Sequence, residues 1–102
     1  MPHFFLKLVA PRPTFAADMT DDEKARMHDH FRYWKSRQDA GEVVVFGPVL
    51  DPKGAYGMGV VAAPDEAAAR AFADADPAVR SIRGFYCEIH PMRAVIRNNQ
   101  NP

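Results

Sequence analysis

The segment from residue 3 to residue 9 (HFFLKLV) is the feature that most limits how this chain can fold. Read as a strand, it points its even-numbered side chains, one phenylalanine and two leucines, toward one face, because successive side chains alternate. The opposite face still carries Phe5 and Val9. Since soluble domains rarely expose large apolar patches, we expect both faces of this strand to be covered.

Two helices are predicted, and each has end signals in the sequence. The first begins at Thr20, which forms a capping-box pattern with Glu23, and it ends before Gly41, where a left-handed residue commonly closes a helix. The second begins after Asp65 as N-cap. Pro77 is expected to stop it, because proline cannot continue a helix.

The remaining periodicity predicts strands and connections. Gly47-Pro48 is expected to end the second strand, and a turn is expected at residues 51–54. Residues 10–19, which hold two prolines and show no clear period, are predicted to form a loop. The predicted strands cover residues 3–9, 42–46, 55–63 and 83–91, and residues 93–97 could add a short edge strand.

The resulting order, β-α-β-β-α-β, predicts an α+β domain of the ferredoxin-like type, with an antiparallel sheet and two helices on one face. Two helices cover only one face, so the apolar side chains on the other face predict a homodimer whose sheets pack together. We expect one domain over residues 1–97 and a frayed polar tail over residues 98–102.

The charge balance and the cysteine content limit which partners and which cellular compartment we expect for this chain. The 102 residues contain 13 Lys plus Arg and 13 Asp plus Glu, so the chain has no excess positive charge to favour nucleic acid or a membrane surface. No apolar stretch approaches the roughly 20 residues that span a bilayer. With Cys87 as the single cysteine and no secretory hydrophobic segment, we expect a cytoplasmic protein.

Most familiar catalytic patterns are missing from the sequence. His28 and His30 are two residues apart on a helix and point in nearly opposite directions, and Cys87 and His90 face opposite sides of a strand, so we expect no metal site. Neither serine lies in a nucleophile elbow. Flavin and nicotinamide fingerprints are absent, and we expect no cofactor.

His30 is the titratable residue best placed for chemistry. It borders the apolar stripe of the first helix near Tyr33, and a half-buried histidine suits proton transfer near neutral pH. A carboxylate would have to orient it, and Asp74 and Asp76 stand at the end of the second helix. The same residues fit a packed histidine and a turn-forming aspartate before proline.

The order of several short segments resembles the YciI-like family. These segments are HFRYW at 30–34, GEVVVFGP at 41–48, ADADP at 73–77 and EIHPMR at 88–93. The resemblance implies a ferredoxin-like fold, a dimeric α+β barrel and an active site of one histidine and one aspartate. Carried over by position, these are His30 and Asp76. Some relatives look like lyases that act on small cyclic or aromatic compounds, and nearby dimeric-barrel folds include isomerases and monooxygenases.

We therefore expect a cofactor-independent enzyme in which His30, oriented by Asp76, performs acid–base chemistry of the lyase or isomerase type on a small organic molecule. The pocket is expected between the first helix and the sheet, under the loop 12–15, where Arg12 could hold a substrate carboxylate. Alternatively, the chain is a non-catalytic homodimeric module that binds a small molecule or assists another protein, and the pair is structural. The predicted substrate contacts are Arg12, Phe15, Tyr33, Phe46, Gly47 and Pro48.

Overall fold

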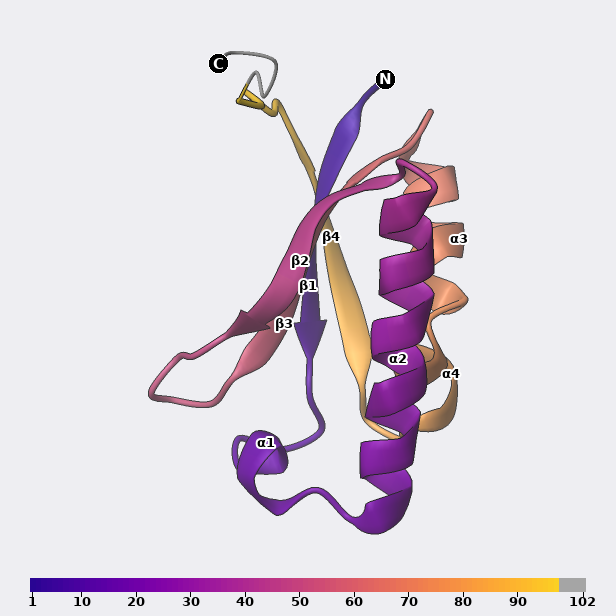
Figure 1. Ribbon diagram of the computed structural model, residues 1–102. Coiled ribbons are helices and arrows are strands. Elements are labelled where there is room, and N and C mark those ends of the chain that lie inside the picture. Colours follow the sequence, from indigo (N-terminus) through magenta and orange to yellow (C-terminus); the bar gives the residue numbers. More distant parts are fainter. Residues whose placement is uncertain (98–102) are drawn as a thin grey trace, which may run out of the picture.

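The computed structural model describes residues 1–97 (Figure 1). The predicted tail at residues 98–102 lies outside the described residues. Strands and helices follow one another as β1 His3–Val9, α1 Phe15–Asp18, α2 Asp21–Asp39, β2 Val43–Val49, β3 Tyr56–Ala62, α3 Glu66–Asp74, α4 Pro77–Ser81 and β4 Tyr86–Met92.

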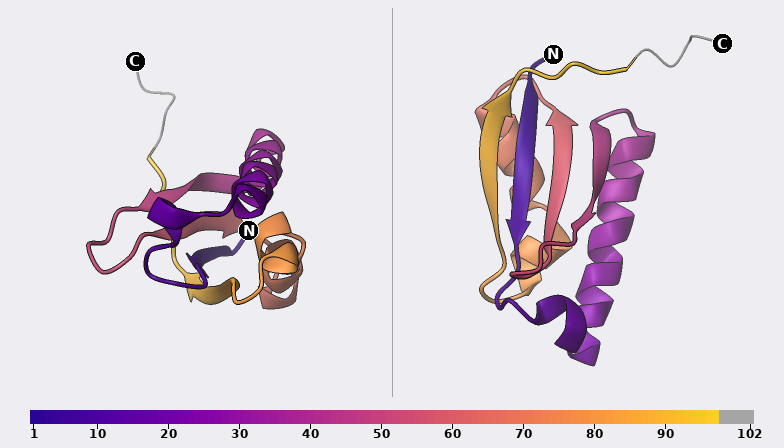
Figure 2. Two further views of the ribbon diagram at one scale, coloured as in Figure 1. Left: turned by 90° about the horizontal axis from the view of Figure 1, so that it is seen from below. Right: turned by 90° about the vertical axis from the view of Figure 1, so that its left-hand side faces the viewer.

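The four strands form one sheet in the order β2-β3-β1-β4, and every neighbouring pair is antiparallel. Helices α2, α3 and α4 pack on one face of this sheet, and the opposite face bears no helix of the described chain (Figures 1 and 2). The prediction of a ferredoxin-like α+β fold is confirmed. No helix within residues 1–97 is both long and apolar enough to cross a membrane.

The core lies between the sheet and the helices. Phe4, Leu6 and Leu8 of β1 are each at most 4% exposed and point toward the helices, as the alternation predicts. Trp34 of α2 is 1% exposed and packs over Gly59 of β3. A Cβ at Gly59 would lie only 2.2 Å from the indole ring, so glycine is what lets the tryptophan reach the sheet.

The predicted ends of α2 are confirmed. The Thr20 hydroxyl accepts a hydrogen bond from the Glu23 backbone N–H at 3.1 Å, and the Glu23 carboxylate accepts one from the Thr20 N–H at 2.9 Å. Gly41 has a φ of +86°, the left-handed conformation expected after a helix. Asp65 caps α3 by accepting from the Ala68 N–H.

Three predictions about the connections are wrong. The loop 10–19 contains the short helix α1. β2 does not end at Gly47-Pro48 but continues to Val49, which is possible because β2 is an edge strand and a missing N–H can face outward. Residues 93–97 form no strand.

Pro77 does more than stop α3, because it also begins α4. Asp76 has an extended backbone conformation, and its side chain accepts from the Ala78 N–H, so it is the N-cap of α4. Proline in the first turn costs no hydrogen bond, since that N–H has no partner within the helix. The prediction missed this helix, which is only five residues long.

Candidate active site

A histidine–aspartate pair links α2 to the start of α4. His30 Nδ1 lies 2.8 and 2.9 Å from the two carboxylate oxygens of Asp76, although the residues are 46 positions apart in the sequence. The His30 side chain is 15% exposed and that of Asp76 is fully buried. The structure thus brings together the two residues that the family resemblance singles out.

Three N–H groups surround the Asp76 carboxylate. Besides His30, the Trp34 indole donates at 2.7 Å and the Ala78 backbone N–H donates at 2.9 Å. A buried carboxylate needs such partners, because leaving a charge in the interior without hydrogen bonds is very costly. Asp76 is therefore held from three directions, and its orientation sets that of the imidazole.

The contacts determine which nitrogen of His30 is available. A carboxylate accepts hydrogen bonds, so Nδ1 carries the proton in this arrangement, and Nε2 of the neutral ring is left as the acceptor. Within residues 1–97, Nε2 has no hydrogen-bond partner, and no buried polar side-chain atom lacks one. Nε2 is therefore accessible and can take up a proton.

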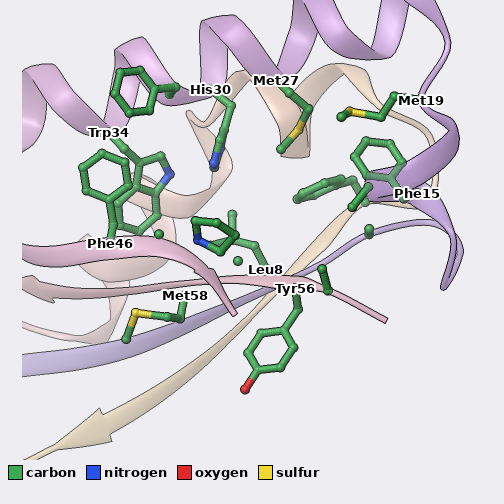
Figure 3. A pocket seen from close by; sticks show the side chains of 17 residues that line it. Leu8, Phe15, Met19, Met27, His30, Trp34, Phe46, Tyr56 and Met58 are labelled. Carbon is green, nitrogen blue, oxygen red and sulfur yellow. The ribbon is translucent and has the colours of Figure 1, made fainter. Parts of the chain in front are cut away.

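A cavity of about 420 Å³ opens beside His30, between α2, the inner face of the sheet and α1 (Figure 3). This volume lies within the usual range for small-molecule sites. His30 projects from α2 toward the sheet, with Trp34 on one side of it and Met27 on the other. Most of the wall is formed by aromatic, aliphatic and methionine side chains.

Four of the predicted substrate contacts line this cavity. Phe15 reaches it from α1, and its side chain is only 4% exposed. Phe46, Gly47 and Pro48 line it from β2, and Gly47 and Pro48 lie in the part of the strand that the prediction left out. The expected location, between the first long helix and the sheet and beside the loop after β1, agrees with where the cavity lies.

Tyr33 does not line the cavity. Its hydroxyl donates to the Phe72 carbonyl at 2.8 Å, and its ring packs against Phe72 with centroids 5.2 Å apart. Burial, with a smaller contribution from the charge of Asp76, raises the pKa of Tyr33 to about 12. Tyr33 thus joins α2 to α3, and its hydroxyl stays protonated at neutral pH.

Arg12 also lies away from the cavity wall, and its guanidinium is already paired. It donates to both oxygens of Glu23 at 2.7 and 2.9 Å and to Asp18 at 2.8 Å. The Arg12 hydrogen bond, followed by that from the Thr20 backbone, lowers the pKa of Glu23 to about 2. The pKa of Asp18 is also lowered, first by the Thr14 hydroxyl and then by Arg12. Arg12 therefore fixes α1 against the start of α2.

Cys87 and His90 lie outside the His30–Asp76 pair. Burial raises the pKa of the Cys87 thiol to about 12, so it is a poor nucleophile at neutral pH. His90 lies on the other face of the sheet from the cavity, 3.4 Å from Glu88. Among the described residues, no three His, Cys, Asp or Glu side chains come close enough to hold a metal ion.

The sequence reasoning missed the role of Trp34. It placed this residue in the apolar stripe of the helix, where it does lie, but a helical pattern carries no information about a hydrogen bond to a residue 42 positions away. One signal was available for Asp76. Asp followed by Pro is a common start of a helix, with the aspartate as N-cap and proline at the first position.

Comparison with known families supports this fold. The four-stranded antiparallel sheet matches the ferredoxin-like fold that the resemblance implied. The profile of the YCII-related domain matches residues 3–93, which is nearly the whole chain, and the protein belongs to this family. Among proteins with curated descriptions, none matches the sequence.

Proposed function

We propose that this protein is a cofactor-independent enzyme that uses His30 as a general base and acid on a small organic molecule. The observation that carries the proposal is the contact between His30 Nδ1 and the buried Asp76, which leaves Nε2 available beside a cavity. An aspartate in this position holds the imidazole in one tautomer and stabilises the imidazolium once it forms.

The chemistry would be a proton transfer of the lyase or isomerase type. Nε2 removes a proton from carbon or oxygen of the substrate, and the electron pair of that bond moves into the substrate as a new double bond or an enolate. In a lyase the pair expels a leaving group, whereas in an isomerase the imidazolium returns the proton to another atom. Acid–base assistance of this kind contributes roughly 10²- to 10⁴-fold in rate.

Deuterium exchange tests the proposal without a known substrate. In D₂O, the protein is incubated with a panel of small cyclic ketones, lactones and phenols, and loss of carbon-bound hydrogen is followed by NMR. We expect exchange of at least one compound to be accelerated by the wild type and to fall roughly 10²- to 10⁴-fold in His30→Ala. His28→Ala, an exposed histidine on the same helix, is the matched control. Equal rates for His30→Ala and the wild type would end the proposal.

The non-catalytic alternative also has support, because the same pair cross-links α2 and α4. His30 is mostly buried and Asp76 fully so, which fits a contact that serves stability. Thermal unfolding separates the two functions. A large loss of stability in His30→Ala, with no exchange activity in the wild type, favours a structural pair in a small-molecule-binding or accessory module.

We further propose that two copies pair through the open face of the sheet, in a reducing compartment such as the cytoplasm. Val45 of β2 and Tyr86 and Met92 of β4 lie on that face, on the two edge strands, and are 48%, 51% and 38% exposed. Val45→Glu is expected to shift the protein toward monomer in analytical ultracentrifugation. Val95→Glu, at a fully exposed position outside the sheet, should not. A wild type that is monomeric at high concentration would contradict the pairing.

A further inference from the structure

The wall of the cavity contains almost no polar side chains. Within residues 1–97, no lysine, arginine, aspartate or glutamate is among its 17 lining residues. Only His30, Trp34 and Tyr56 bring a side-chain nitrogen or oxygen to this set. What each of these three atoms does decides which ligand the cavity can accept.

Two of the three polar groups are not available to a ligand. The Trp34 indole N–H donates to Asp76. The Tyr56 ring points away from His30, on the far side of β3 (Figure 3). There it lies under Lys7, whose Nζ is 4.6 Å from the ring centroid. Among the lining residues of the described chain, His30 Nε2 is therefore the one side-chain polar atom left to meet a ligand.

In the described part of the chain, no lysine or arginine side chain lines the cavity to balance a negative ligand. Arg12, the cation predicted to contact a substrate, is bound to Glu23 and Asp18 and does not line the cavity. The buried Asp76 carboxylate behind His30 and Trp34 would repel an anion further. Since burying a charge without a partner is expensive, a carboxylate or phosphate in this cavity would bind poorly.

We propose that the cavity selects an uncharged, largely aromatic molecule with a single ionisable O–H or C–H group that meets His30. The proton-accepting role of His30 rests on the proposed function, but the preference for an uncharged ligand rests on the cavity wall alone. The expectation that Arg12 holds a substrate carboxylate is thereby replaced.

The volume of the cavity and the side chains of its wall limit the range of possible ligands further. A cavity of about 150 Å³ accepts benzene, so about 420 Å³ has room for a fused bicyclic ring system with substituents. Phe15, Phe46 and Phe85 offer ring faces and edges for stacking. Met19 and Met27 can adjust their conformations to ligands of different outline.

The test compares three ligands with the same bicyclic ring and different charge at pH 7. These are naphthol, which is uncharged, naphthoate, which is an anion, and naphthylmethylamine, which is a cation. Binding to the wild type is measured by calorimetry and by the fluorescence of Trp34, the only tryptophan in the chain. We expect naphthol to bind at least tenfold more tightly than either charged ligand. Equal or tighter binding of naphthoate or naphthylmethylamine overturns the inference, as does no binding of naphthol at millimolar concentration.

A cation introduced into the wall sharpens the result. Met27→Lys is expected to reduce or reverse the preference for naphthol over naphthoate, because it supplies the missing positive charge. Ala25→Lys, at an exposed position of the same helix, is the control and should leave the preference unchanged. If Met27→Lys does not fold, the affinities of the three ligands for the wild type still test whether the cavity prefers an uncharged molecule.

Failure of this inference can be told apart from failure of the proposed function. In His30→Ala the preference for the uncharged ligand should remain within about threefold of the wild-type value, since the wall is intact. If naphthol is preferred but no deuterium exchange depends on His30, the function is wrong and the cavity assignment holds. If exchange depends on His30 but naphthoate binds as well as naphthol, the proposed function holds and the cavity assignment is wrong.

Discussion

Two ionic networks hold distant parts of this chain together, and they differ in their exposure to water. The Asp76 network with His30 and Trp34 is buried, with the aspartate fully inaccessible. In the Arg12 network, the side chains of Arg12, Asp18 and Glu23 are 34%, 51% and 17% exposed. Water can replace the partners of the second network but not those of the first. The hydrogen bonds of the Asp76 network should therefore contribute to global stability. Those of the Arg12 network should mainly order the local structure.

Removing the buried carboxylate should have the largest effect. Asp76→Ala leaves the His30 and Trp34 ring nitrogens and the Ala78 N–H without their partner, and each buried donor left unpaired costs about 1–3 kcal/mol. We expect a loss of this size in urea unfolding. Asp74→Ala, at an exposed position on α3, is the control and should cost little. An Asp76→Ala protein as stable as the wild type would mean that the network does not support the fold.

Crowding Trp34 should have the next largest effect. In Gly59→Ala, the new methyl group would meet the indole ring, and overpacking of this kind costs about 1–3 kcal/mol. Gly47→Ala, on the neighbouring strand with no atom within 4 Å of the new Cβ, is the matched control. Urea unfolding measures both variants. If Gly59→Ala is no less stable than Gly47→Ala, the contact between Trp34 and the sheet is looser than described.

Breaking the exposed network should change local order more than global stability. Glu23→Gln keeps a side chain that can complete the capping box but removes the charge that Arg12 binds. We expect a smaller shift in the urea midpoint than for Gly59→Ala, together with faster proteolysis within residues 10–19. Arg26→Ala, which loses only a surface contact to Asp22, is the control. Unchanged proteolysis would show that Arg12 does not restrain α1.

Acid should weaken the exposed network over a defined pH range, and this is the smallest expected effect. The pKa of Glu23 is lowered from 4.5 to about 2 in the folded protein, so the unfolded chain binds more protons between these values. The stabilisation is complete above pH 4.5 and is lost as the pH falls toward 2. The difference in unfolding free energy between wild type and Glu23→Gln should shrink over this range. A difference that does not change with pH would contradict the lowered pKa.

Signals carried by neighbouring residues predicted most of the fold. The alternation in β1, the capping box at Thr20 and Glu23, and the glycine after α2 are all local patterns, and the structure follows them. The predicted end of β2 was wrong because a local rule, that proline ends a strand, does not hold at the edge of a sheet. Pro48 can lie inside a strand only because β2 is at the sheet edge, and a sequence does not state which strand is outermost.

The candidate site was less predictable from the residues alone. The partner of His30 came from the family resemblance, since periodicity left both Asp74 and Asp76 possible. The Trp34 hydrogen bond and the position of Arg12 depend on packing between segments distant in sequence. The apolar cavity likewise results from the way α1 and β2 meet α2, which no single segment encodes.

Asp76 caps α4 through Oδ1 and holds the His30 ring through both carboxylate oxygens. A chain in which the last helix has come loose would keep His30 on an intact α2 but would let its ring rotate. Such a species would look largely folded by circular dichroism, and under the proposed function it would be inactive. On gentle heating, His30-dependent exchange should then be lost before the helical signal, and the temperature interval between the two losses would measure how independently α4 unfolds.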